Sequence, residues 1–325
     1  MRLLLPLLLG CAAPGAASDT GPAALEVDPF LLGVNYPWMS YGNDFGSNAW
    51  GAYGASSETE RLDADFAALA EAHVEVVRWF VFGDGRASPE FATDGTPTDL
   101  EPLFWDDMDA AVDAAEAHGL QLVPVLLDFG WFAGAEEVSG VQVGGHSDAF
   151  ADPVKRNALV DDVVLPLLQA YGDRPGILAW DLLNEPEWAM DGFGEEWLGG
   201  TVQSDDVYAF VDAVVPLIAS ETVHLSTLGS ASSLWLTQHW IDRDLTLLQV
   251  HWYGANEPSI SAWDLCGETR CVIGEFGTSA DYAPIGEVLD GAVDMGWDGA
   301  WAWSYGAADE ASDLSLVQLA EWGAR

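Results

Sequence analysis

The chain has 325 residues, of which 50% are apolar, and its 53 acidic and 10 basic side chains give a formal net charge of −43. A surface this acidic repels phosphate backbones, so we do not expect a nucleic-acid partner. The length favours one domain, since a barrel of alternating strands and helices takes about 250 residues.

The start of the chain has the pattern of an export signal. A positive start is followed by the apolar run Leu3–Leu9, which is far too short to span a bilayer. The sequence Leu8-Leu9-Gly10-Cys11 resembles the lipobox of bacterial lipoproteins, whose cysteine is lipidated. We therefore predict a signal peptide over residues 1–10 and a lipidated Cys11 with a flexible tether over residues 11–27. The alternative is an ordinary signal cut near Ala17 or Ser18.

This interpretation also predicts a location. The protein would be exported and held at a bacterial membrane by its lipid anchor alone, facing the periplasm or the cell exterior. Export favours a disulfide between the two remaining cysteines, Cys266 and Cys271, whose spacing closes a short loop. A zinc site would need more ligands than this pair offers.

Beyond the tether, short apolar runs alternate with longer amphipathic segments. The predicted strands are residues 33–36, 75–82, 121–127, 177–183, 224–228, 245–252, 271–274 and 299–304. Helices are predicted at 57–70, 106–118, 152–171, 205–220, 234–241, 285–295 and 314–322. Ser57 and Glu60 have the spacing of a capping box, and Pro166 is expected to disturb its helix.

This alternation predicts a fold. Near-continuous apolar strands separated by helices indicate a parallel sheet that is covered on its faces. Eight such units favour an α/β fold of the (β/α)8 TIM-barrel type, as a single catalytic domain over residues 28–325. A doubly wound open sheet is the alternative, but it rarely needs eight units. No Gly-x-Gly-x-x-Gly follows the first strand, which argues against a dinucleotide site. We expect no cofactor.

In such a barrel the active site lies at the carboxyl ends of the strands. Two glutamates, Glu185 and Glu275, end predicted strands four and seven. Glycoside hydrolysis needs a pair of carboxyl groups, one to protonate the leaving oxygen and one to attack the anomeric carbon or activate water. The alternatives are that Glu185 only starts a helix and that Glu275 is a surface loop residue. Other polar and aromatic strand-end groups are Arg78, Asp128, Asn184, His251, Tyr253, Trp301 and Trp303.

The pattern of these residues resembles the clan A glycoside hydrolases, most closely the cellulase-type family five, over residues 30 to 323. The resemblance implies that Glu185 is the acid/base, that Asn184 bonds the sugar 2-hydroxyl and that Glu275 is the nucleophile. It further implies that Arg78 orients the nucleophile.

The resemblance also implies that His251 and Tyr253 form the His-x-Tyr of strand six and that Trp303, rather than Trp301, stacks on the reacting sugar. One position departs from the family. Its members often place a histidine after strand three, whereas here Asp128 is followed by Phe129-Gly130-Trp131. The departure leaves the sugar open.

Further aromatic residues suit sugars, whose apolar faces stack on indole rings. We predict substrate contacts for Trp38, in an aromatic first loop over residues 35–46, and for Trp131 beside Asp128. Core packing is the alternative for each tryptophan.

The predicted function is a retaining β-glycoside hydrolase that acts by double displacement on a mannan- or glucan-type polysaccharide or oligosaccharide. We expect a monomer without a metal ion. A non-catalytic glycan-binding lipoprotein would be expected to lack Glu185, Glu275 or Arg78, and all three are present. A transglycosylase would use the same residues. A metal-dependent hydrolase barrel would need histidine clusters, whereas the six histidines are scattered.

Overall fold

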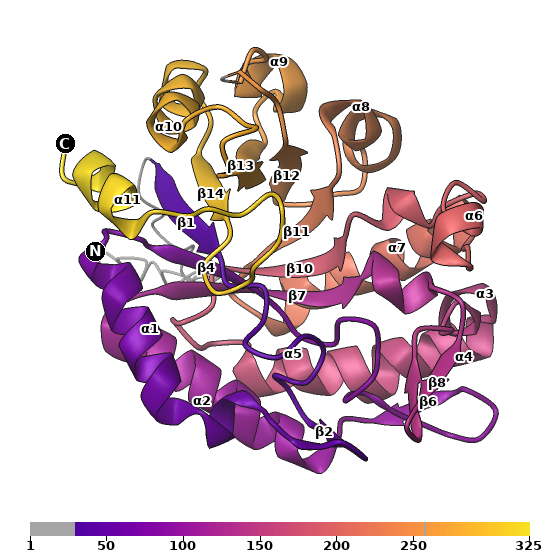
Figure 1. Ribbon diagram of the computed structural model, residues 1–325. Helices are drawn as coiled ribbons and strands as arrows, with labels where there is room; N and C mark the ends of the chain where they lie inside the picture. The colour runs from indigo at the N-terminus through magenta and orange to yellow at the C-terminus, as the bar shows by residue number, and fades with distance from the viewer. Residues whose placement is uncertain (1–29, 257) are drawn as a thin grey trace, which may run out of the picture.

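The computed structural model describes residues 30–325 except Glu257. The predicted signal peptide, the lipidated Cys11 and the tether lie outside these residues. Eight parallel strands close into a barrel in the order β1-β14-β13-β12-β11-β10-β7-β4 (Figure 1), which confirms the predicted fold. They are β1 (Leu31–Asn35), β4 (Val76–Phe80), β7 (Gln121–Asp128), β10 (Ala179–Asn184), β11 (Leu225–Ser230), β12 (Leu247–Trp252), β13 (Arg270–Gly277) and β14 (Gly299–Trp303).

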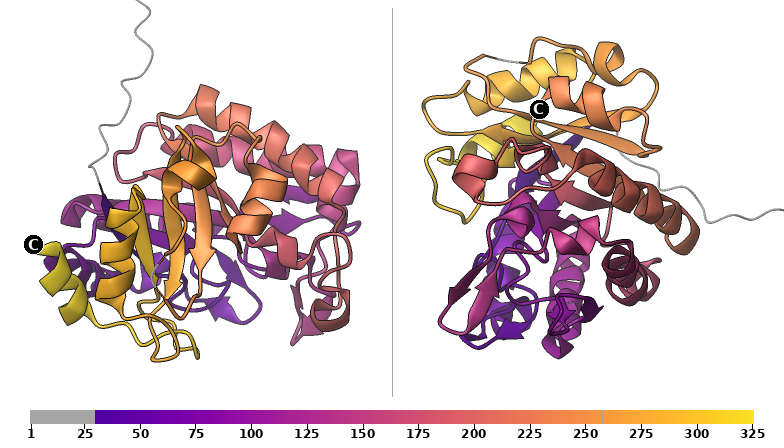
Figure 2. Two further views of the ribbon diagram at one scale, coloured as in Figure 1. Left: turned by 90° about the horizontal axis from the view of Figure 1, so that it is seen from above. Right: turned by 90° about the vertical axis from the view of Figure 1, so that its right-hand side faces the viewer.

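Helices surround the strands on the outside of the barrel (Figure 2). They are α1 (Thr59–Glu71), α2 (Pro102–His118), α4 (Pro153–Ala158), α5 (Leu165–Tyr171), α7 (Ser204–Glu221), α8 (Ser233–Trp235), α9 (Ala262–Cys266), α10 (Ile285–Asp294) and α11 (Leu316–Gly323). The unit between β12 and β13 has only the five-residue α9, which the disulfide Cys266–Cys271 joins to β13. No helix among the described residues is long and apolar enough to cross a membrane.

The predicted capping box at the start of α1 is wrong. Ser57 belongs to a 3-10 turn, η1 (Ala55–Ser57), and its hydroxyl donates to the carbonyl of Gly54. Glu58 precedes α1 without a side-chain cap. The turn is held from outside instead, because Asp107 accepts hydrogen bonds from the backbone and hydroxyl of Ser56. A tertiary contact thus replaces the local cap.

The predicted helix over residues 152–171 forms, with a disturbed centre. Asp152 caps its start by accepting from the amide of Val154 at 2.8 Å, and Pro153 occupies the first turn. Between α4 and α5 the residues Leu159–Val164 form a π-helix, η3. Pro166 follows directly, and because proline has no N–H it cannot continue the regular hydrogen-bond ladder.

The barrel interior is layered. At the amino ends of the strands Leu31, Val76, Val123, Leu247 and Trp301 pack together. Two residues further along, the inward positions carry polar groups such as Arg78 and Gln249, because alternate residues of a strand point to the same side. The chain therefore places apolar packing at the bottom and a polar network directly beneath the carboxyl ends of the strands.

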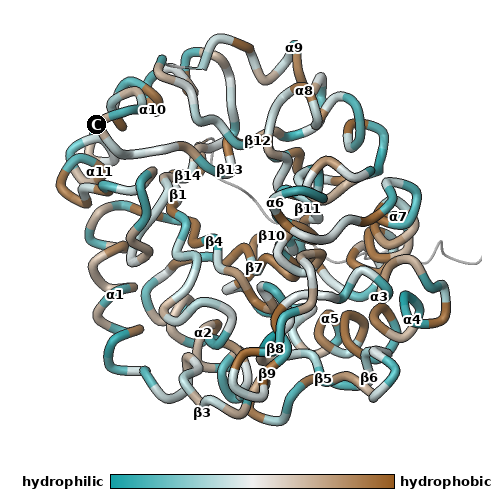
Figure 3. The backbone as a smooth tube through the Cα atoms, turned by 45° about the vertical axis from the view of Figure 1, so that its right-hand side comes forward, coloured by the Kyte–Doolittle hydropathy of each residue, from teal (hydrophilic) through white to brown (hydrophobic). Residues whose placement is uncertain are grey.

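Three small hairpins extend the loops after β1, β4 and β7. They are β2 (Ser47–Asn48) with β3 (Gly51–Ala52), β5 (Glu90–Phe91) with β6 (Pro97–Asp99), and β8 (Glu136–Val138) with β9 (Val141–Val143). Their labels gather along one edge of the barrel in Figure 3. Because these loops follow barrel strands, the hairpins lie on the same face as the predicted active site.

Candidate active site

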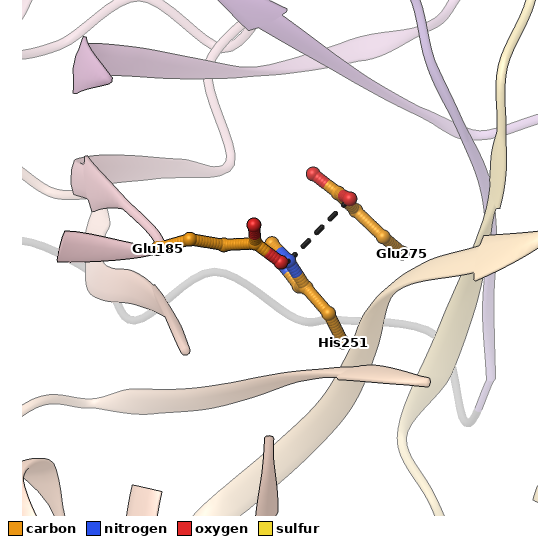
Figure 4. Close-up of side chains that lie close together, drawn as sticks. All are labelled: Glu185, His251 and Glu275. Carbon is orange, nitrogen blue, oxygen red and sulfur yellow. Dashed lines mark hydrogen bonds and ion pairs between the residues drawn. The ribbon is translucent and has the colours of Figure 1, made fainter. Parts of the chain in front are cut away.

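Two glutamates face each other at the mouth of the barrel. Glu185 directly follows β10 and Glu275 lies in β13. One carboxylate oxygen of each and a ring nitrogen of His251 all lie within 4.8 Å of one another (Figure 4). Retaining glycosidases place their two carboxyl groups about 5–5.5 Å apart, whereas inverting enzymes need about 6.5–9.5 Å to admit a water molecule. The separation fits direct attack on the anomeric carbon.

The backbone of Glu185 is in the left-handed region, with φ 45° and ψ 47°. Non-glycine residues seldom adopt this conformation, and it is common at functional sites. Its amide donates to the carbonyl of Gly229 in the neighbouring strand β11 at 2.7 Å. The strand end therefore turns sharply, and Pro186 begins the next 3-10 turn, η4 (Pro186–Trp188).

Arg78 organises the groups beneath the cleft. It is fully buried, and its guanidinium donates to Glu275 Oε1 at 2.6 Å and to Asp181 Oδ2 at 2.8 Å. It also donates to the side-chain oxygens of Asn184 and Asn35. Arg78 does not line the cleft. It contacts Glu275 and Asn184 from below, and its fully buried side chain presents no surface to the cleft.

Tyr253 holds the other oxygen of Glu275. Its hydroxyl donates to Oε2 at 2.7 Å. Burial and the nearby charge of Glu275 raise the pKa of Tyr253 well above its ordinary value, so the hydroxyl stays protonated. Glu275 thus receives one hydrogen bond on each carboxylate oxygen.

The two glutamates differ in their charge environment. Burial raises the pKa of Glu185 to about 7, against the hydrogen bond from Trp188 and the charge of Arg78. Burial also raises the pKa of Glu275, against the opposing effects of His251 and Arg78. Only Glu275 contacts a guanidinium directly, at 2.6 Å. Of the two, Glu275 is therefore the one that ionises and Glu185 the one that keeps a proton.

His251 lies between the two carboxyl groups. Its Nδ1 is 2.7 Å from Glu185 Oε1 and 3.4 Å from Glu275 Oε2. Burial lowers the pKa of His251 to about 4, so the ring is neutral near pH 7. Its other nitrogen, Nε2, is buried without a hydrogen-bond partner among the described residues.

Glu185, His251 and Glu275 are also the one group of three metal-ligating side chains within the described part of the chain. All four carboxylate oxygens already have protein partners. Arg78 and Tyr253 hold Glu275, whereas His251 and Trp188 hold Glu185. A guanidinium at 2.6 Å disfavours a cation at the same carboxylate. This donor set suits proton transfer and nucleophilic attack better than metal binding.

The cleft above these residues has a volume of about 580 Å³. Asn184, Glu185, Tyr253 and Glu275 lie in its floor and walls. Aromatic side chains supply much of the remaining surface, namely Trp38, Tyr41, Phe80, Phe129, Trp188 and Trp303. A cleft with a few polar groups among aromatic rings suits a sugar chain, which stacks its apolar faces and hydrogen-bonds its hydroxyls.

The two tryptophans of β14 lie at different depths in the barrel, and only one of them reaches the cleft. Trp301 is fully buried in the lower layer of the barrel, and a Cβ on Gly33 would lie only 2.2 Å from its ring. Trp303 reaches the cleft, where its indole N–H donates to Asp309 at 2.7 Å. The structure thus places Trp303, and not Trp301, where a sugar can stack.

Asp128 and the first loop also reach the site. Asp128 accepts from Asn184 Nδ2 at 2.9 Å and from the hydroxyl of Tyr41 at 3.1 Å. Trp38 and Tyr41 both line the cleft, in agreement with a substrate-facing first loop. Tyr41 and Asp309 are site residues that the sequence did not single out. Tyr41 lies in the predicted first loop without a motif of its own, and Asp309 lies in the loop after β14.

The predicted substrate contact of Trp131 is wrong. Its side chain is fully buried and its indole N–H donates to the carbonyl of His146 at 3.1 Å. The ring packs against Phe91 and His146 under the hairpins of loops two and three, away from the cleft. A loop tryptophan next to Asp128 is therefore a core residue, because loops distant in sequence cover it.

No family model matches the chain. Its sequence is 25% identical over 337 residues to a mannan endo-1,4-beta-mannosidase from Cryptopygus antarcticus, with 89% of this chain and 84% of the relative covered. It is 24% identical over 339 residues to the enzyme of that name from Mytilus edulis, covering 91% and 89% of the two chains.

Solved structures share the fold. The β-1,4-D-mannanase from Cryptopygus antarcticus superposes with a TM-score of 0.75 at 22% identity, covering 90% of this chain and 89% of that one. The β-mannanase from the blue mussel Mytilus edulis gives a TM-score of 0.72 at 21% identity, covering 90% of each chain. With its closed parallel barrel and these relatives, the chain is a glycoside hydrolase whose (β/α)8 barrel is similar to that of the cellulase-type, family-five members of clan A.

Proposed function

We propose that the protein cleaves internal linkages of a β-1,4-mannan by double displacement, with Glu275 as nucleophile and Glu185 as acid/base. The observation that carries the proposal is that one carboxylate oxygen of Glu185 and one of Glu275 lie within 4.8 Å of each other. This spacing suits a covalent intermediate. The names of the relatives support mannan over glucan as the polysaccharide.

In the first step a carboxylate oxygen of Glu275 attacks the anomeric carbon while the bond to the leaving sugar breaks. Glu185 gives its proton to the leaving oxygen and becomes a carboxylate. In the second step this carboxylate takes a proton from water, whose oxygen displaces Glu275 from the anomeric carbon. Both glutamates return to their starting states, and the two inversions give overall retention.

Asn184 is arranged to contact the reacting sugar. Its Oδ1 accepts from Arg78 and one amide hydrogen points to Asp128, which leaves the second hydrogen of Nδ2 for a sugar hydroxyl. The two partners fix the amide orientation, because reversing it would place the amide nitrogen against a guanidinium and the amide oxygen against a carboxylate. This supports the 2-hydroxyl contact that the family resemblance implied.

Cleavage within a polymer is supported by an aromatic surface on the Glu185 side of the cleft. Trp188 packs at 5.0 Å from Trp235, at 5.4 Å from Phe193 and at 6.2 Å from Trp197. Phe193 and Trp197 are more than half exposed. Because Glu185 protonates the leaving oxygen, the leaving part of the chain lies on this side, where several sugars could stack.

The same surface would hold an acceptor sugar, so transglycosylation is the second candidate. Both reactions retain the anomeric configuration, and only the acceptor differs. The test is to incubate the protein with β-mannan, glucomannan and β-glucan and to follow the products by ¹H NMR. We expect β-configured reducing ends from mannan as the first product. Initial α products would rule out double displacement, and longer oligosaccharides formed from mannotetraose would identify transglycosylation.

We further propose that the protein is exported, lipid-anchored through Cys11, and monomeric. The support is the sequence Leu8-Leu9-Gly10-Cys11 after an apolar run. Cys11→Ser should move the protein from the membrane fraction to the soluble fraction and remove incorporation of labelled fatty acid, with the specific activity kept. A variant that still fractionates with the membrane would contradict the anchor.

A further inference from the structure

A second cavity lies outside the catalytic cleft, on the same face of the barrel. It has a volume of about 600 Å³. All three hairpins contribute to its wall: the first through Asn48 and Ala49, the second through residues 91–95, and the third through residues 140–142. We call this cavity the outer pocket. Loops that carry binding sites are commonly extended in this way, and the closed barrel itself does not require these hairpins.

The floor of the outer pocket contains an unused polar atom. His146 is only 5% exposed, and its Nε2 is buried with no hydrogen-bond partner among the described residues. Its ring stacks on Phe91, with centroids 4.2 Å apart and planes 9° apart. Burial lowers the pKa of His146 to about 4, so the ring is neutral near pH 7 and able to donate or accept toward a neutral ligand.

Two glycines allow the backbone to pack closely in the wall of the outer pocket, one of them directly against this ring. A Cβ on Gly85 would lie 2.6 Å from His146 Nε2, and a Cβ on Gly145 would lie 2.3 Å from the Cβ of Ala135. Both glycines line the pocket and have positive φ, at 83° and 79°. Any other residue would be strained there and would clash with His146 or Ala135, so the shape of the pocket wall depends on both glycines.

The charged groups of the outer pocket are balanced. Arg86 pairs with Asp84 through two of its nitrogens. Lys155, the only lysine of the chain, is 3.3 Å from Asp148 and donates to the backbone oxygen of Asp94 at 2.5 Å. A cavity with paired charges, polar groups and a partly exposed aromatic ring suits a neutral ligand with many hydroxyls better than an anion.

The outer pocket adjoins the catalytic cleft. The guanidinium of Arg86 lies 4.7 Å from the ring centroid of Tyr41. Arg86 lines the outer pocket, whereas Tyr41 lines the cleft and donates to Asp128. The stacked pair therefore forms the partition between the two cavities.

We propose that the outer pocket is a second saccharide-binding site, which holds a segment of the β-linked polysaccharide away from the point of cleavage. The proposal rests on the proposed function for the identity of the polymer. Binding there would raise the local concentration of polymer at the cleft without affecting the chemical step. Short substrates that fill only the cleft would gain nothing from it.

The test uses the full chain with Lys155→Met, which keeps the aliphatic stem, and His146→Phe, which keeps the stacked ring. The control is Arg243→Met, which removes one cation that pairs with Asp212 in α7, outside both cavities. Binding is measured as retardation in native gels that contain soluble β-mannan. Turnover is measured on the same mannan and on an aryl β-mannoside, and melting temperatures check the fold.

We expect about fivefold weaker retardation and a similar rise in KM for mannan in both pocket variants, the effect of losing one net hydrogen bond. Turnover of the aryl mannoside and the behaviour of Arg243→Met should match the parent. Unchanged retardation and KM in both folded pocket variants would overturn the proposal. If the parent is retarded by mannan but does not hydrolyse it, the proposed function fails while the pocket is still tested by the gels.

Discussion

The indole N–H of Trp188 donates a hydrogen bond of 2.8 Å to Oε2 of Glu185, three residues earlier in the chain. The turn η4 brings the two side chains together, and Trp188 also lines the cleft. A donor fixed to a carboxyl oxygen stabilises its ionised form. Trp188 therefore influences both the orientation of the acid/base and the pH at which it loses its proton.

Trp188→Phe should shift the pH profile of the enzyme. Removal of the N–H raises the pKa of Glu185, and because Glu185 must be protonated at the start, activity should persist to higher pH. A net hydrogen bond of about 1 kcal/mol corresponds to a shift of roughly 0.7 pH units in the basic limb of kcat/KM. Trp235→Phe is the control, since Trp235 packs on Trp188 but does not bond Glu185. A basic limb that stays in place, or moves to lower pH, would contradict this role.

Alanine variants of the two glutamates should be distinguishable by chemical rescue. Glu275→Ala should lower kcat by about four orders of magnitude. Azide should partly restore its turnover and give a glycosyl azide of inverted, α configuration.

Glu185→Ala should behave differently. It should still form the covalent intermediate from dinitrophenyl glycosides, whose leaving group needs no proton. Azide should then give a product of retained, β configuration. The measurement is the anomeric configuration of the glycosyl azide that each variant forms. Swapped configurations would reverse the two roles.

The buried acid Glu187, which lies near the site, should make stability depend on pH. Glu187 accepts hydrogen bonds from Ser230 and Trp240, and burial raises its pKa to about 7. Because the folded pKa lies above the ordinary value, its contribution to stability is present below about pH 4 and is lost as the pH rises through about 7.

Glu187→Gln should therefore gain stability relative to the parent between about pH 5 and pH 8. The comparison with the parent is needed because burial lowers the pKa values of His146 and His251, which act in the opposite direction. The measurement is the melting temperature of the variant and of the parent at about pH 5 and at about pH 8. Glu136→Gln, at an exposed position in β8, should follow the parent at both. If the melting-temperature advantage of Glu187→Gln over the parent shrinks as the pH rises, ionisation of Glu187 does not destabilise the folded protein.

The net charge of −43 should make stability depend on salt. Charges of one sign repel over about 30 Å at 0.01 M salt but over only about 3 Å at 1 M. The melting temperature should therefore rise between these two concentrations of sodium chloride. Potassium chloride should have the same effect if screening is the cause, whereas a flat or falling melting temperature would contradict it.

The sequence alone determined the order of the eight barrel strands and the position of the catalytic pair. Buried parallel strands are apolar throughout, so each stands out between amphipathic helices, and all carboxyl ends meet at one face of a barrel. Asn184-Glu185 and Glu275 could therefore be placed at one site although 90 residues separate the glutamates. The predicted helix over residues 152–171 forms, but the cap at Ser57 failed because Asp107, distant in sequence, binds that turn instead.

Only the tertiary structure decided how deep each side chain lies in the barrel, how far apart the two carboxylates are, and how the loops pack. Trp301 and Trp303 point to the same side of one strand, and only their height in the closed barrel separates a core residue from a cleft residue. The spacing of the two carboxylates depends on the diameter of the barrel and on Arg78, and no local pattern encodes either. Trp131 is buried and the outer pocket exists because three hairpins from separate loops pack together, and such long-range contacts leave no periodic signal in the chain.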